Sequence, residues 1–82
     1  MMTFEDLSTQ LQQALGDAEV SVLDRTGTMD HFTVNVISDA FEGKNLLDRH
    51  RMIYQALDAP MKDGRIHALE IKAKTRNEAQ GG

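Results

Sequence analysis

The stretch of the chain that decides its fold is residues 31–38, His31-Phe32-Thr33-Val34-Asn35-Val36-Ile37-Ser38. Phe32, Val34 and Val36 occupy every second position, which is the period-two pattern of a strand with one face on a core. A shorter run of strand character lies upstream at residues 19–24, and the glycine-containing polar residues 25–30 connect the two runs. We therefore expect these two strands to form a hairpin.

Helical patterns flank the hairpin on both sides. Upstream, Thr3 can cap a helix of about three turns, because apolar residues recur at helical spacing until Gly16 closes the pattern. Downstream, Asn45 can cap a second helix. This second helix is expected to run to about residue 57, because Pro60 cannot continue it.

The C-terminal part completes the predicted sheet. Residues 65–73 predict a third strand, preceded by the turn signal Asp63-Gly64. Thr75 and Glu78 fit a capping box, but only seven residues follow Thr75, so we expect no more than a frayed helical turn or a tail. The order helix, strand, strand, helix, strand predicts an α+β fold with helices on one face of a three-stranded sheet.

Length and composition indicate a small globular protein. The 82 residues and 9.2 kDa correspond to one domain, which we expect to be ordered over about residues 3–76. Hydrophobic residues make up 40% and charged residues 27%, which disfavours disorder and coiled coils. No apolar run exceeds three residues, and acidic residues stand at positions 5 and 6. We therefore expect neither a membrane span nor a signal peptide, and a cytoplasmic protein.

Cysteine content and charge restrict the chemistry that the chain can perform. The chain has no cysteine, so a metal must be held by histidine, by carboxylate or by a partner. Residues 1–41 carry one basic and seven acidic residues, whereas residues 42–82 carry eight basic and six acidic ones. This local basic surface permits an anionic partner but argues against strong nonspecific nucleic-acid binding. No nucleophile arrangement or glycine-rich phosphate loop is present, so we expect no enzyme.

Two stretches of the sequence resemble the hallmark segments of the BolA-like protein family. They are Phe41-Glu42-Gly43-Lys44-Asn45-Leu46-Leu47-Asp48-Arg49-His50-Arg51-Met52-Ile53-Tyr54-Gln55-Ala56-Leu57 and Arg65-Ile66-His67-Ala68-Leu69. With Asp-His-Phe at positions 30–32, the resemblance covers about residues 3–76. It implies a class II KH-like fold, αββαβ with a variable last helix. Arg76 follows Thr75 here where the family usually has proline, so the resemblance does not fix where the last helix begins.

The resemblance implies a partner protein rather than an enzyme. BolA-like proteins are known as partners of monothiol glutaredoxins, with which they share a [2Fe–2S] cluster that glutathione also helps to hold. The expected role is therefore in iron–sulfur assembly, trafficking or iron sensing. Some family members are DNA-binding regulators, which is the alternative function. We expect no membrane contact, and a monomer or weak homodimer when the protein is free.

By this resemblance, His67 is the family's cluster ligand and His31 is the second. The family offers a cysteine or a histidine near position 31, and this chain has no cysteine. The residues alone leave alternatives open. Strand alternation would put His67 on the same face as Leu69 and Ile71, as a partly buried core histidine, and His31 could be an exposed residue at a strand start. Ligation of one iron by both requires their nitrogens to approach within about 4 Å.

A second set of candidates is basic. Lys44, Arg49 and Arg51 could form a face that contacts DNA phosphates, on a helix over residues 45–57 that would enter a major groove. The alternative is a solvated, ion-paired helix surface. This segment has one glycine, so RNA binding by a KH-type GxxG loop is not supported. His50 lies on or beside the buried stripe of the same helix and is expected to pack there.

Overall fold

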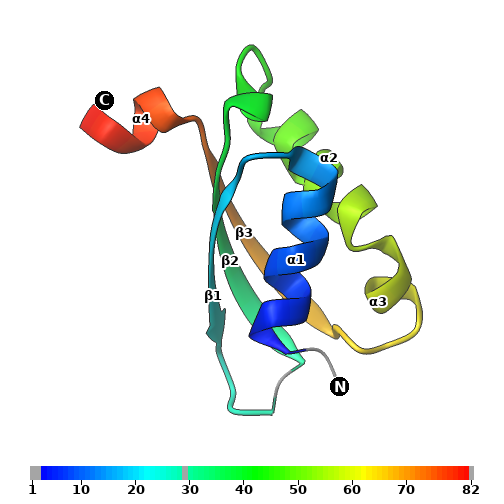
Figure 1. Cartoon of the computed structure of the whole chain (residues 1–82). Coiled ribbons are helices and arrows are strands. Elements are labelled where there is room, and N and C mark those ends of the chain that lie inside the picture. The colour runs from blue at the N-terminus through cyan, green and yellow to red at the C-terminus, as the bar shows by residue number, and fades with distance from the viewer. Residues whose placement is uncertain (1–2, 29, 82) are drawn as a thin grey trace.

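The computed structural model describes residues 3–28 and 30–81, and it has one three-stranded sheet in the order β1-β2-β3 (Figure 1). The strands are β1 (Glu19–Asp24), β2 (His31–Ile37) and β3 (Ala68–Lys74). The helices are α1 (Phe4–Leu15), the short 3-10 helix η1 (Asp39–Phe41), α2 (Leu46–Ala56), α3 (Asp58–Lys62) and α4 (Arg76–Gly81).

The strand pairing determines which residues of distant segments meet. β1 and β2 are antiparallel, with Val22 opposite Val34, which confirms the predicted hairpin. β3 lies parallel to β2, with Ile71 opposite Val34 and Ala68 opposite His31. Because the pairing is parallel, β2 and β3 begin at the same end of the sheet. In Figure 1 this is the lower end, where the hairpin loop and the segment before β3 also lie.

The long helices cover one face of this sheet, as the α+β prediction required. α1 packs on β1 and α2 packs on β3, while α4 lies apart at the far end of β3 (Figure 1). The predicted caps are confirmed. The Thr3 hydroxyl accepts the Asp6 N–H at 3.0 Å, and the Asn45 side chain accepts the Asp48 N–H at 2.8 Å. These bonds satisfy backbone donors that a helix start otherwise leaves unpaired.

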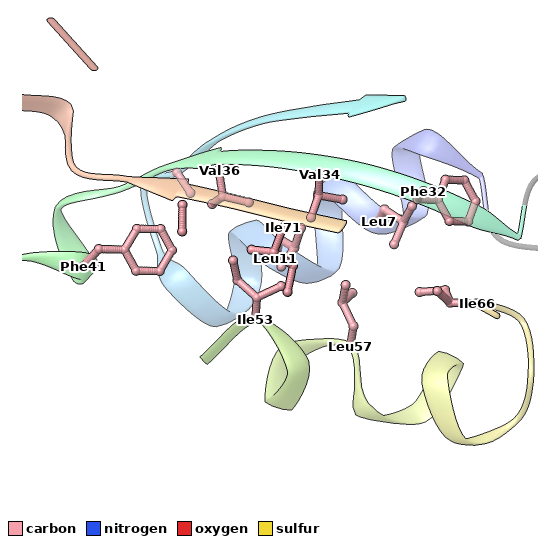
Figure 2. Packing of buried hydrophobic residues seen from close by; sticks show 12 residues of the cluster. Leu7, Leu11, Phe32, Val34, Val36, Phe41, Ile53, Leu57, Ile66 and Ile71 are labelled. Carbon is pink, nitrogen blue, oxygen red and sulfur yellow. The ribbon is translucent and has the colours of Figure 1, made fainter. Parts of the chain in front are cut away.

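The hydrophobic core lies between the sheet and the helices, and it contains the alternating residues Phe32, Val34 and Val36 of β2 (Figure 2). The helical pattern is only partly confirmed, because Leu46, Leu47 and Tyr54 of α2 are exposed. Its buried residues are Leu7, Leu11, Ala18, Phe32, Val34, Val36, Phe41, Ile53, Leu57, Ile66, Ile71 and Ala73. Residues from α1, β2, α2 and β3 all contribute, so the core fixes the sheet relative to both long helices. Among the described residues, no helix is long and apolar enough to cross a bilayer.

The third strand begins at Ala68, three residues later than the predicted start at position 65. The preceding backbone donors are used elsewhere: the Arg65 N–H donates to the Asp63 side chain at 3.0 Å and the Ile66 N–H to the Pro60 carbonyl at 3.1 Å. These bonds hold the segment in a turn instead of a ladder. His67 consequently precedes the strand, and strand alternation does not apply to it.

The helix break at position 57 is confirmed, with a short helix added after it. α3 contains Pro60 within its first turn, where a missing N–H removes no intrahelical bond. At the C-terminus, the Thr75 hydroxyl accepts the Glu78 N–H at 3.1 Å, and the Glu78 carboxylate accepts the Thr75 N–H at 2.9 Å. This is the predicted capping box, and the six-residue helix α4 that follows it replaces the expected frayed turn.

Candidate metal centre

His31 and His67 meet at the shared beginning of β2 and β3. His31 is the first residue of β2, and its partner in the register is Ala68, so His67 lies directly beside it. The centroids of the two imidazole rings are 5.9 Å apart, and the rings are nearly perpendicular at 86°. The side chains are 39% and 58% exposed, respectively. The parallel pairing therefore brings two accessible imidazoles together from positions 36 residues apart in sequence.

Asp30 completes this cluster, because its carboxylate lies between the two rings. The Oδ1 atom is 2.7 Å from Nδ1 of His31, and the Oδ2 atom is 2.9 Å from Nδ1 of His67. One possible ligand atom from each of the three residues lies within 4.8 Å of those of the other two. In the sequence, Asp30 next to His31 is a common dipeptide, and it is only a weak signal of a functional site. Its bond to His67 depends on the parallel register, which the sequence does not state.

The backbone and a hydroxyl hold Asp30 in place. Its carbonyl oxygen accepts the His67 N–H at 2.7 Å and the Ala68 N–H at 3.2 Å, so the loop is fastened to the start of β3. The Thr28 hydroxyl donates to the Asp30 carboxylate. This hydroxyl, and then the His31 imidazole, lower the pKa of the Asp30 carboxyl from its ordinary value. Asp30 is therefore an ionised acceptor at neutral pH.

The alternative in which His67 is a partly buried core histidine is wrong, because more than half of its side chain is exposed. The residue lies in the turn before β3 rather than in the strand, so it does not share a face with Leu69 and Ile71. Gly64 stands on the Nε2 side of the ring. A Cβ atom placed on Gly64 would lie 4.0 Å from Nε2, and its φ of +86° is a conformation that favours glycine.

The three basic candidates do not share one exposed face. Arg49 is buried, and its guanidinium donates to the Glu78 carboxylate at 2.7 and 3.2 Å and to the Ala73 carbonyl at 3.2 Å. Its Nε donates to the Lys44 carbonyl at 2.9 Å. The expectation that Arg49 reaches phosphates is therefore corrected, because these acceptors use its donors. Lys44 and Arg51 are exposed, and Arg51 lies 3.9 Å from Asp48.

Comparison with known proteins connects this site to a family. A family model described as BolA-like protein matches residues 7–78. Protein BOLA2 of Arabidopsis thaliana is 44% identical over 73 residues, which are 88% of this chain and 76% of that protein. The DNA-binding transcriptional regulator BolA of Escherichia coli is 33% identical over 88 residues, covering 99% of this chain and 83% of that protein.

Solved structures agree with these sequence comparisons. A bolA protein homologue from Coxiella burnetii superposes with a TM-score of 0.82 at 34% identity, covering 98% of this chain and 99% of that one. The superposition includes nearly the whole chain, so the two proteins share one fold.

Proposed function

This chain belongs to the BolA-like protein family, and on this premise we propose that it is the partner of a monothiol glutaredoxin, with which it shares a bridging [2Fe–2S] cluster. The role is in iron–sulfur assembly, trafficking or iron sensing. His67 and His31 hold one iron, while thiolates of glutaredoxin and glutathione hold the other. The observation that carries the proposal is the meeting of one exposed and one half-buried imidazole on a chain without cysteine.

The donor set fits this half of such a cluster. Two histidines replace two cysteines on one iron of Rieske [2Fe–2S] centres, so a pair of neighbouring imidazoles is a known ligand set for this cluster type. Here the pair comes from the beginnings of two adjacent strands, and the exposed side chains are reachable by a second protein. The cluster would supply electron transfer and a transferable iron–sulfur unit, and the chain's own residues hold and release it.

Histidine ligation also explains why a thiol-free partner would be useful. Neutral imidazole in place of thiolate removes negative charge from one iron, which raises the reduction potential. A cluster held by glutaredoxin alone has thiolates on both irons. Exchange of one half for His31 and His67 therefore changes the electronic state and the lability of the cluster, which suits a carrier or a sensor.

Visible circular dichroism tests this proposal. Cluster-loaded monothiol glutaredoxin is titrated with the wild type, with His67→Ala and with His50→Ala, which removes the histidine of α2 that lies outside the cluster. We expect the wild type and His50→Ala to change the spectrum in the same way, and His67→Ala to lose that change. A spectrum that the wild type leaves unaltered, or that His67→Ala changes equally, contradicts the proposal.

DNA binding is a second candidate, favoured by the name of the Escherichia coli relative. Its remaining exposed candidates are Lys44, in the loop before α2, and Arg51, on α2. The formal net charge of −4 works against DNA binding. A titration of duplex DNA at low and high salt tests it. Binding that weakens with salt and with the double variant Lys44→Ala/Arg51→Ala supports this function, and negligible affinity at low salt removes it.

We further place the protein in the cytoplasm, as a monomer or weak homodimer when free, and we assign it no catalytic reaction. The proposal instead makes cluster transfer depend on a second protein. Size-exclusion chromatography with light scattering, on the protein alone and mixed with cluster-loaded glutaredoxin, measures both states. A stable oligomer of the free protein would contradict the assignment of a monomer or weak homodimer.

A further inference from the structure

The Asp30 carboxylate engages each imidazole through a different oxygen. Oδ1 lies 2.7 Å from Nδ1 of His31, and Oδ2 lies 2.9 Å from Nδ1 of His67. The contact to His31 is a hydrogen bond, and the contact to His67 is a close charge contact. An ionised carboxylate has no hydrogen to donate and repels the lone pair of a bare ring nitrogen, so the hydrogen of each ring is favoured on Nδ1. A neutral imidazole has one N–H, which leaves Nε2 of each ring with a free lone pair.

We propose that Asp30 is a positioning residue that fixes both imidazoles in the Nδ1–H tautomer, so that His31 and His67 bind metal through Nε2. This inference rests on the proposed function, since the metal is one iron of the shared cluster. Asp30 itself does not touch the iron. It selects which nitrogen of each ring is free to do so, and it orients the two rings together.

The surroundings of Asp30 hold its carboxylate in a fixed position beside the two imidazole rings. Its carbonyl oxygen binds the backbone N–H groups of His67 and Ala68, and the Thr28 hydroxyl binds its carboxylate. Without such a bond, an exposed imidazole rotates and exchanges between its two tautomers. A carboxylate that accepts the second N–H of a metal-binding histidine also increases the basicity of the ligand nitrogen.

The nitrogen of His67 that the inference assigns to the metal faces Gly64. A Cβ atom placed on Gly64 would lie 4.0 Å from Nε2 of His67, so glycine keeps a side chain away from this nitrogen. The Nδ1 atoms, by contrast, are both occupied by Asp30 at hydrogen-bond distance. The two nitrogens of His67 therefore face different surroundings, one closed by the carboxylate and one bordered by glycine.

The variant Asp30→Asn tests the inference sharply, because asparagine keeps the size of the side chain and its backbone bonds. An amide has one accepting oxygen and one NH2 donor, whereas the carboxylate has two accepting oxygens. Only one ring can therefore remain bonded as an Nδ1–H donor. The matched control is Asp63→Asn, which changes a nearby carboxylate bonded to Arg65 and not to the histidines.

Imidazole ¹⁵N chemical shifts in the free, metal-free protein report the tautomers directly, at a pH near 8 where imidazoles are neutral. We expect the wild type and Asp63→Asn to show protonated Nδ1 and bare Nε2 for both His31 and His67. Asp30→Asn should lose this signature in one ring or in both. Mixed tautomers in the wild type, or unaltered tautomers in Asp30→Asn, would overturn the inference.

Cluster retention in the complex separates this inference from the proposed function. With glutaredoxin, Asp30→Asn should hold the shared cluster about 10-fold less tightly than the wild type, as expected for loss of a residue that orients a ligand. If the wild type shares a cluster and Asp30→Asn holds it equally well, the inference fails and the proposed function stands. If the wild type shares no cluster, the proposed function fails, and the assignment of Nε2 to iron fails with it.

Discussion

The two ends of β3 carry two charge clusters of opposite design. At its beginning lies the histidine corner, which consists of Asp30, His31 and His67, and at its end lies the arginine corner, which consists of Arg49 and Glu78. In the histidine corner one carboxylate lies within 2.9 Å of a ring nitrogen of both His31 and His67. In the arginine corner one guanidinium, with its side chain only 10% exposed, bonds a carboxylate and backbone carbonyls.

The difference separates a cluster that joins segments of the fold from the cluster that we propose binds a metal. Four of the five Arg49 N–H donors bond acceptors in the loop before α2, in β3 and in α4, so this buried side chain joins three segments of the fold. Asp30 instead contacts the Nδ1 atom of each imidazole and does not contact Nε2 of either ring. Three polar side chains thus form the histidine corner, and two form the arginine corner that joins segments of the fold.

Removing the arginine corner should give the largest loss of stability. Arg49→Ala leaves the Ala73 carbonyl and the Glu78 carboxylate without their charged donor, and it removes the guanidinium 5.9 Å from the Phe41 ring. We expect the free energy of unfolding to fall by about 2 kcal/mol, because the lost hydrogen bonds have a charged donor while the Glu78 side chain is 47% exposed to solvent. Urea denaturation followed by far-UV circular dichroism measures this value.

Arg51→Ala is the matched control, two residues along the same helix. Arg51 is exposed and lies 3.9 Å from Asp48, so its removal should change the free energy of unfolding by less than about 0.5 kcal/mol. Equal losses for the two variants would show that the Arg49 network contributes no more than a surface ion pair.

Acid should weaken the arginine corner with a defined sign. The Arg49 guanidinium, and then the Thr75 backbone N–H, lower the pKa of Glu78 from 4.5 to about 2. Because the folded-state pKa lies below the unfolded one, the stabilisation is complete above about pH 4.5 and is lost as the pH falls toward 2. Urea denaturation across this range should show a steeper loss for the wild type than for Glu78→Gln, and parallel curves would contradict this account.

The histidine corner should contribute least to stability. His31→Ala and His67→Ala remove side chains that are 39% and 58% exposed, so each should change the free energy of unfolding by less than about 1 kcal/mol. The same urea denaturation, run on the metal-free proteins, compares them with Arg49→Ala. A loss as large as that of Arg49→Ala would mean that this corner is structural, and the contrast between the two ends would disappear.

The sequence predicts the elements of the fold better than the contacts between them. Alternation at Phe32, Val34 and Val36 locates β2, and the caps Thr3 and Asn45 locate the starts of α1 and α2, because these signals are local. The family resemblance adds the two histidines. Local signals do not show how distant elements pair. The predicted start of β3 at residue 65 is therefore three residues earlier than the observed start at Ala68.

The missed residues depend on such distant pairing. Asp30 reaches His67 only because β2 and β3 run parallel in one register, and Arg49 is buried only because Glu78 returns to it from 29 residues away. An arginine on a helix reads as solvated until the partner is known. In both cases the role of a charged residue depends on contacts between segments that are distant in sequence, and these contacts are visible only in the folded structure.

Pulsed electron paramagnetic resonance of the reduced cluster in the glutaredoxin complex tests the central claim most directly. With ¹⁵N-histidine incorporated only in this chain, couplings from coordinated imidazole nitrogens identify its ligands. The account predicts strong couplings from two histidines at one iron, reduced to one by His31→Ala and abolished or greatly weakened by His67→Ala. A reduced cluster that shows no strong histidine coupling, or couplings unaffected by both substitutions, would contradict it.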